Sequence, residues 1–313
     1  MTFRAISAFL VLFTPAIGCS PHASDLSHWP DASRYWHVIM NADQNIENYV
    51  RIHPEYFVHD KLVTDLGVDD VKIGGEENAR QTYKRVRSLL ESKGMYVGTY
   101  VSGRTVSRQA QTHTRLPPYS ACVEEMPPNA RYLGSWPSDP DRKIIDVDDA
   151  DTRHALERGI LRLWKAYPAP FHFVDNMTPH PMVQRGNSWK AACQYMAELR
   201  EMGESLGSRV LFNIPMHVGL LSDQETHQLI RAVGEGGIVL EMPWHSTIRQ
   251  SKQATDRAAF RYRQLLDSGM AIVMIPVSTP LDQLTSWVQT WRKPTDRLYV
   301  AVPFFKPPPA PNN

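Results

Sequence analysis

The feature that most constrains the fold is a regular alternation of short apolar runs with longer amphipathic stretches in the C-terminal half of the chain. A short apolar run is typical of a strand buried on both faces, and an amphipathic stretch of helical period is typical of a helix that covers such a sheet. Repetition of this unit predicts a parallel sheet with helices outside. We expect strands at 171–177, 209–216, 237–243, 270–277 and 297–303, and helices at 189–206, 223–233, 255–267 and 281–291.

The N-terminal half follows the same pattern less clearly. We expect strands at 35–42, 56–63 and 95–101, and helices at 45–53, 76–93 and 149–167. Eight strands, each but the last followed by a helix, predict an α/β fold of the (β/α)8 TIM-barrel type, as one domain over residues 35–305. A doubly wound open sheet is the alternative, although no Gly-rich phosphate loop follows the first strand. The Pro-rich stretch 102–142 predicts a long loop after strand three.

The N-terminal residues have the pattern of a targeting segment. Arg4 precedes an apolar run that is too short to cross a membrane, which is typical of a signal peptide over residues 1–18. The following "AIGC" resembles the bacterial lipobox, which implies cleavage before Cys19 and a lipid on its sulfur. Ser20, in place of Asp, implies the outer membrane, facing the periplasm or the surface. An ordinary signal peptide cleaved nearby is the alternative. Residues 19–34 then predict a lipidated tether, and 306–313 a Pro-rich tail.

Charge and cysteine content limit the partners. The formal net charge is +1 and no dense basic run is present, so we expect no nucleic-acid partner. Cys122 and Cys193 could form one disulfide in an oxidising compartment or remain two separate thiols. His172 and Asp175 point to opposite faces of one strand, and no HxxxH or CxxC pattern occurs. We therefore expect neither a metal nor a cofactor.

Two of the predicted strands end in a carboxylate. "FHFVDNM" ends in Asp175 and Asn176, and "GIVLEMPW" carries Glu241. Because ligands bind at the C-terminal ends of parallel strands, the pair suggests the two carboxyl groups of glycoside hydrolysis. The Asn176 amide could hold Asp175 ionised, as a nucleophile or base. Glu241 lies between Leu240 and Met242, and apolar surroundings raise a carboxyl pKa, so we assign it general acid/base.

Polar and aromatic residues at the other strand ends suit a polyhydroxylated ligand, whose hydroxyls need hydrogen-bond partners and whose ring faces need flat apolar ones. We expect carbohydrate binding by Asp60, Asn176, Asn213, His217, Trp244, His245 and Phe304.

Several segments together resemble a known group. In "KIIDVDDADTRHALERGILRLWKAYPAPFHFVDNM", Asp146 and Arg153 precede a strand that ends in Asp175, and "VLFNIP" and "GIVLEMPW" follow. These segments, within residues 35–303, resemble bacterial glycoside-hydrolase-like TIM barrels related to family 114, the endo-α-1,4-polygalactosaminidases. The resemblance implies a carbohydrate substrate and a catalytic Glu241. Analogy with barrels that place a nucleophile on strand four and an acid on strand six implies a retaining mechanism.

Three hypotheses follow for function. The first is a lipid-anchored glycoside hydrolase that cleaves a polysaccharide. The second is a non-catalytic carbohydrate-binding envelope lipoprotein on a degenerate barrel, in which Asp175 and Glu241 would pair with Arg or Lys. The third is a structural envelope protein whose strand ends dock a partner.

Overall fold

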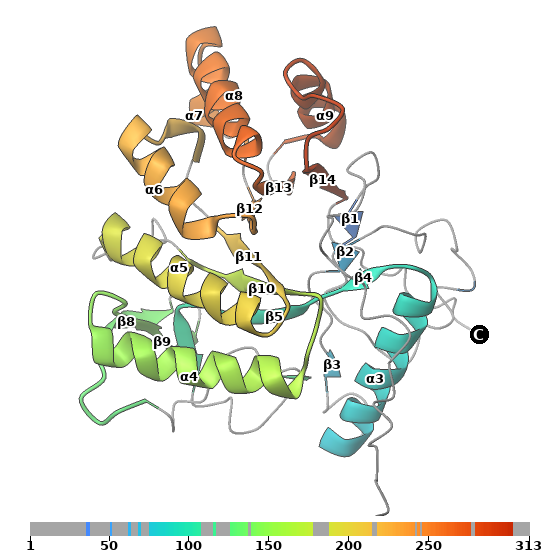
Figure 1. Cartoon of the computed structure of the whole chain (residues 1–313), viewed down its shortest axis with the longest axis vertical. Helices are drawn as coiled ribbons and strands as arrows, with labels where there is room; N and C mark the ends of the chain where they lie inside the picture. The colour runs from blue at the N-terminus through green and yellow to red at the C-terminus, as the bar shows by residue number, and fades with distance from the viewer. Residues whose placement is uncertain are drawn as a thin grey trace, which may run out of the picture.

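The computed structural model describes residues 36–37, 51, 62–63, 68–69, 75–107, 115–116, 126–136, 139–177, 188–214, 218–241, 243–244, 246–276 and 279–302. These residues form an α/β fold with a mainly parallel sheet and helices packed outside it (Figure 1). The arrangement is consistent with a TIM-barrel-like fold.

The main sheet has nine strands in the order β4-β2-β1-β14-β13-β12-β11-β10-β5, and neighbouring strands are parallel. Their bounds are β1 Trp36–His37, β2 Leu62–Val63, β4 Tyr96–Val97, β5 Thr99–Ser102, β10 Phe171–Asp175, β11 Arg209–Asn213, β12 Gly237–Leu240, β13 Ala271–Met274 and β14 Leu298–Val302. The first and last strands of this order, β4 and β5, are separated in the chain by Gly98 alone. A Cβ at Gly98 would lie 2.3 Å from the Phe171 ring, so this close approach requires glycine.

Among the described residues, six helices lie at positions expected from the sequence, with bounds that differ by a few residues, and one short helix after β12 was not expected. They are α3 Glu76–Ser92, α4 Ala150–Ala166, α5 Trp189–Ser205, α6 Asp223–Val233, α7 Ser246–Arg249, α8 Lys252–Asp267 and α9 Leu281–Gln289, with a 3-10 turn η4 at Val218–Leu220. Side chains that accept hydrogen bonds from the first-turn amides fix the starts of α4, α5, α6 and α8, namely those of Asp149, Ser188, Ser222 and Ser251. Of the helix expected at 45–53, only residue 51 is described, and it is helical.

The long loop expected at 102–142 is partly folded into strands, which corrects that expectation. β6 Thr105–Ser107, β9 Asp139–Ile145 and β8 Tyr132–Trp136 form an antiparallel sheet in the order β6-β9-β8. A second small antiparallel pair joins β3 Val68–Asp69 to β7 Arg115–Leu116. Pro140 lies where the register between β8 and β9 shifts. Proline has no backbone N–H, and such an irregularity tolerates the loss of one hydrogen bond between the strands. These strands are short and lack a regular alternation of apolar and polar residues, so the Pro-rich composition of the stretch predicted a loop instead.

Side chains alternate between two sides of the main sheet. One set forms a small inner cluster that includes Phe171, Phe173, Leu211, Val239 and Val273. The residues between them pack against the helices in the larger core, among them Val174, Phe212, Ile238 and Leu240. By this period of two, the residues that follow the inner set at the strand ends are Asp175, Asn213 and Glu241.

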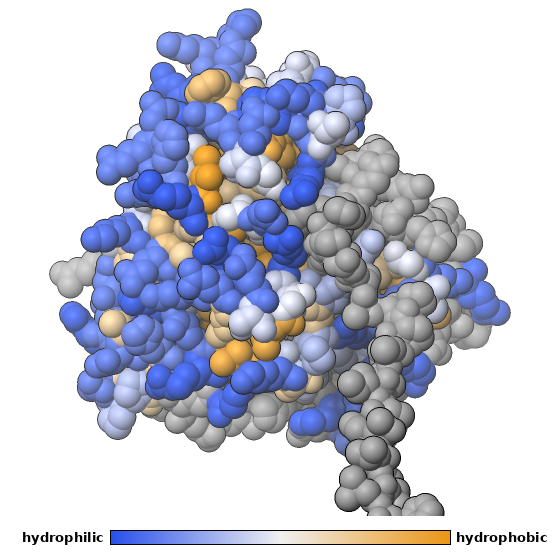
Figure 2. Space-filling model, in the orientation of Figure 1, coloured by the Kyte–Doolittle hydropathy of each residue, from blue (hydrophilic) through white to orange (hydrophobic). Residues whose placement is uncertain are grey.

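The outer helix face is polar. In Figure 2, hydrophilic side chains cover most of the described surface, with hydrophobic atoms visible between them. Within the described residues, no helix has the length and apolar character needed to cross a membrane. The segments that the sequence suggested as a signal peptide, a lipidated tether with Cys19 and a Pro-rich tail lie outside the described residues.

Candidate active site

Asp175 is the last residue of β10, and its carboxylate is held by three hydrogen bonds. Its Oδ2 accepts from the Tyr100 hydroxyl at 2.6 Å and from the Asn176 Nδ2 at 2.9 Å. Its Oδ1 accepts from the Asn176 backbone N–H at 2.8 Å. The carboxylate therefore has a fixed orientation at the C-terminal end of the sheet.

Asn176 adopts a left-handed backbone conformation, with φ at 61°. Asparagine tolerates this region better than most residues, and the turn brings both its backbone and its side-chain donors onto Asp175. Asn176, which the sequence suggested as a substrate-binding residue, thus places its amide on the carboxylate of Asp175.

Glu241 follows β12 and pairs with a residue of the strand between the two carboxylates. Asn213, at the end of β11, donates from Nδ2 to Glu241 Oε1 at 2.9 Å. Asn213 is 2% exposed, and its Oδ1 has no hydrogen-bond partner among the described residues. Tyr100, Asp175, Asn213 and Glu241 thus come from consecutive strands, β5, β10, β11 and the end of β12.

Electrostatics separate the two carboxyl groups. Burial raises the pKa of Asp175, although the hydrogen bonds from Tyr100 and Asn176 and the charge of Arg142 oppose this. Burial also raises the pKa of Glu241, the charge of Asp175 raises it further, and one hydrogen bond from Asn213 opposes it. Asp175 therefore receives more hydrogen bonds to its charged form than Glu241 does, and the charge of Asp175 favours the protonated form of Glu241.

The expected rise in the pKa of Glu241 is therefore confirmed. The Asn176 amide alone does not bring the pKa of Asp175 below its ordinary value. The hypothesis of a degenerate binding barrel expected both carboxylates to pair with Arg or Lys. Among the described residues, neither Asp175 nor Glu241 makes an ion pair within 4.0 Å.

The sequence did not single out Arg142 and Trp136, which lie on the inserted antiparallel sheet. Arg142 Nε donates to Thr105 Oγ1 at 2.8 Å, and its Nη2 donates to Ser102 Oγ at 3.1 Å. Ser102 is the residue paired with Asp175 across β5 and β10. Nothing in the spacing of the Pro-rich stretch indicates that Arg142 reaches this strand end, because the contact depends on a non-local strand pairing.

Trp244 packs against the larger core. Its indole stacks on Trp287 of α9 at 5.2 Å between ring centroids and packs against the core beneath the helices. The sequence had assigned Trp244 to sugar stacking, and this packing occupies one face of its ring. Of the other expected ligand-binding residues, Asp60, His217, His245 and Phe304 lie outside the described residues.

Cys193 is a free and buried cysteine on α5. The disulfide considered from the sequence is therefore not formed at Cys193, and Cys122 lies outside the described residues. Burial raises the pKa of the Cys193 thiol to about 12, so it is inert as a nucleophile at neutral pH.

One group in the described part of the chain has the composition of a metal site, but away from the strand ends. It consists of His154, Glu157 and Glu198, on α4 and α5. Arg153 already makes an ion pair with Glu198 at 2.8 Å, and a cation there would compete with the guanidinium. Burial, followed by the contact with Glu198, raises the pKa of Glu157 to about 8, so Glu157 holds a proton at neutral pH.

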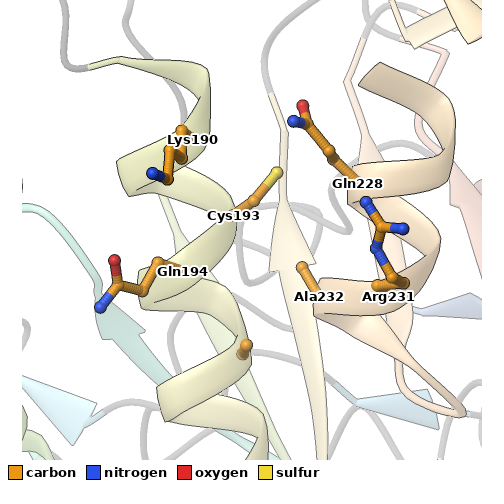
Figure 3. A pocket seen from close by; sticks show the side chains of 7 residues that line it. Lys190, Cys193, Gln194, Gln228, Arg231 and Ala232 are labelled. Atoms are coloured by element: carbon orange, nitrogen blue, oxygen red, sulfur yellow. The ribbon is translucent and has the colours of Figure 1, made fainter. Parts of the chain in front are cut away.

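A shallow groove of about 290 Å³ lies between α5 and α6, on the helix layer (Figure 3). Cys193 points across it toward α6, and Ala197 and Ala232 also line it. Lys190 and Gln194 point away from α6 in this view, so the charged groups do not converge on one point. The groove is thus separate from the carboxylates at the strand ends.

Comparisons with solved structures find proteins of similar architecture at low identity. Aspergillus fumigatus Ega3 in complex with galactosamine is 10% identical, with 88% of this chain and 93% of that chain covered and a TM-score of 0.49. A glycoside hydrolase family 20 β-N-acetylglucosaminidase is 11% identical (79% and 53% covered, TM-score 0.45), and dispersin B is also 11% identical (71% and 67% covered, TM-score 0.39). This chain thus spans about half the length of the family 20 enzyme. No protein-family model matches the chain, and no curated protein matches it in sequence.

Proposed function

We propose that the chain is a glycoside hydrolase that cleaves a polysaccharide between Asp175 and Glu241, at the mouth of a (β/α)8 barrel. The closure of the barrel is supported by the sheet order, whose two ends are adjacent in the chain on either side of Gly98. The active site is supported by the inward period of the strands, which brings a carboxyl group to the ends of β10 and β12.

The observation that carries the proposal is that two neighbouring carboxyl groups lie in different electrostatic environments. Three hydrogen bonds favour an ionised Asp175, and burial together with the charge of Asp175 favours a protonated Glu241. Glycoside hydrolysis requires one carboxylate and one carboxylic acid at the same pH, and environments that push two pKa values apart supply them.

The proposed mechanism is retaining. The Asp175 carboxylate attacks the anomeric carbon while the Glu241 carboxyl gives its proton to the leaving glycosidic oxygen, which breaks the C–O bond. Glu241 then takes a proton from water, and the water oxygen displaces Asp175 from the anomeric carbon. The cycle consumes one water and returns both groups to their starting charge.

Asp175→Asn and Glu241→Gln test these roles, because each removes an ionisable oxygen with little change of shape. Reducing ends released from a panel of neutral, amino-sugar and acidic polysaccharides would be measured with the wild type. Each variant should lose activity by about 10²–10⁴-fold, the range that positioned acid–base groups contribute. Glu201→Gln, at an exposed position on α5, is the matched control. Full activity in the double variant, with an unchanged unfolding temperature, would exclude this pair.

We also propose, from the sequence alone, that a lipid on Cys19 anchors the protein in a bacterial envelope. Metabolic labelling with an alkyne fatty acid should mark the full chain and should fail with Cys19→Ser. Labelling that persists in Cys19→Ser would contradict the assignment.

A further inference from the structure

Arg142 is held at the C-terminal end of β5 by hydroxyl groups. Its Nε and Nη2 donate to Thr105 and Ser102, whose oxygens lie 2.6 Å apart. Both hydroxyl residues are fully or almost fully buried, at 0% and 1% exposed, so they form a rigid support. The Trp136 ring packs on the guanidinium, with the guanidinium carbon 4.5 Å from the ring centroid. These contacts define one orientation of the Arg142 side chain.

Among the described residues, no counterion lies within ion-pair distance of this guanidinium. Arg142 makes no ion pair within 4.0 Å with any carboxylate in the described part of the chain, and its hydrogen-bonding partners there are neutral. A guanidinium has five N–H donors, and the contacts with Thr105 and Ser102 use two of them. The remaining donors include the two on Nη1, for which the described residues provide no acceptor.

The position of Arg142 connects it to the active site. Ser102 is paired with Asp175 across β5 and β10, and the positive charge of Arg142 acts on the Asp175 carboxylate. Arg142 is half-buried, so part of the side chain remains accessible. A cation at this place would sit next to the sugar unit that Asp175 attacks.

We propose that Arg142, supported by Trp136, is a subsite for the carboxylate of an acidic sugar unit, so that the substrate is a uronate-containing polysaccharide. The inference rests on the proposed glycosidase function, which it makes more specific. The two parallel donors at the end of a guanidinium match the two oxygens of a carboxylate, and such bidentate pairs combine charge with geometric selectivity. Arg142 would also offset the repulsion between a substrate carboxylate and the ionised Asp175.

The test compares two ligands that differ only in charge. A uronate oligosaccharide and its methyl ester share the same sugar and linkage, and their dissociation constants would be measured by titration calorimetry. The full chain would carry Glu241→Gln, which prevents turnover. We expect the free acid to bind at least about tenfold more tightly than the ester, as hydrogen bonds to a charged group imply.

Arg142→Gln should abolish this preference and leave ester binding within about twofold, while Arg142→Lys should retain part of it, because lysine keeps the charge but not the fork. Arg209→Gln, at the opposite end of β11 and paired with Glu235, is the control arginine and should change neither constant. Equal binding of acid and ester, or equal weakening of both by Arg142→Gln, would overturn the subsite.

The outcome also separates this inference from the proposed function. If neutral glycans are hydrolysed in a reaction that requires Asp175, with no preference for acidic glycans, the proposed hydrolase is supported and the acidic subsite is contradicted. If the acid is bound selectively through Arg142 but no glycan is hydrolysed, the acidic subsite is supported and the proposed hydrolase is contradicted.

Discussion

The hydroxyl of Tyr100 and the carboxylate of Asp175 form a 2.6 Å hydrogen bond between two parallel neighbouring strands. The Tyr100 ring packs edge-on against Phe173, with 5.5 Å between the ring centroids. Phe173 lies two residues before Asp175, on the same face of β10. The packing of the Tyr100 ring on Phe173 therefore positions the Tyr100 hydroxyl for its hydrogen bond with Asp175 at the C-terminal end of the sheet. The strength of this bond bears directly on the charge of the proposed nucleophile.

Tyr100→Phe should raise the pKa of Asp175, because it removes a donor to the charged form while the ring packing remains. The acidic limb of kcat/KM should move to higher pH, and kcat/KM below neutral pH should fall about tenfold, as expected for a hydrogen bond to a charged group. A pH profile measures both effects. Tyr132→Phe, on the exposed edge of β8, is the control. An acidic limb that stays in place would show that Tyr100 does not act on the ionisation of Asp175.

Asn213→Ala should have the opposite signature, since Asn213 acts on the other carboxyl group. Its Nδ2 stabilises the charged form of Glu241, so its loss should raise the pKa of Glu241 and move the basic limb of kcat/KM to higher pH. The acidic limb should change little.

Asn176→Gly provides the comparison for Asn213→Ala. Glycine adopts the left-handed backbone of residue 176 and keeps the backbone donor to Asp175, so only the side-chain donor is lost. We expect Asn176→Gly to move the acidic limb upward. If both variants moved the same limb, the assignment of separate roles to Asp175 and Glu241 would be wrong.

Local sequence pattern was sufficient for the strands that deliver these groups. β10 and β12 are short apolar runs that end at a carboxylate, and a period of two then orients Asp175 and Glu241. The partners of these groups were only partly accessible to the same reasoning. Asn176 is adjacent in sequence, but the bonds from Tyr100 and Asn213 depend on which strands become neighbours.

The contribution of Arg142 required still more distant information. It reaches Ser102 only because β9 pairs with β6 in an antiparallel sheet, and the Pro-rich stretch carries no periodicity that predicts this pairing. The packing of Trp244 is also non-local, because an aromatic residue at a strand end suits both a sugar and the core, and here Trp244 stacks on Trp287. Its role in sugar binding stays a prediction. Non-local packing thus decides the residues that sequence reasoning missed.

The substitution Glu157→Gln should stabilise the protein, and the gain in the free energy of unfolding should increase as pH rises. The folded-state pKa of about 8 lies above the ordinary value of 4.5, so between these values the unfolded chain ionises Glu157 and the folded chain does not. Folding therefore loses up to about 1.4 kcal/mol per pH unit across this window, and glutamine removes the loss while keeping a donor to Glu198. Urea unfolding at pH 5 and pH 7.5 should show a larger gain at pH 7.5. Exposed Glu201→Gln is the control variant, and an equal gain at both pH values in Glu157→Gln would contradict the prediction.

His172 should make the fold sensitive to acid. It is fully buried, stacks on Trp164 at 4.3 Å between centroids, and shares a 2.7 Å hydrogen bond with Thr99. Burial, with a smaller effect of the Arg87 charge, lowers its pKa to about 3, below the ordinary 6.5. As pH falls between these values, the unfolded chain binds a proton that the folded chain excludes, so stability falls by up to about 1.4 kcal/mol per pH unit.

His172→Gln should be somewhat less stable than the wild type at pH 7.5, because the stacking on Trp164 is lost. On going from pH 7.5 to pH 4.5, the variant should lose less stability than the wild type. His227→Gln, at an exposed position on α6, is the matched control variant. Urea unfolding of the three proteins at both pH values decides the matter, and an undiminished acid loss in His172→Gln would assign that sensitivity to other groups.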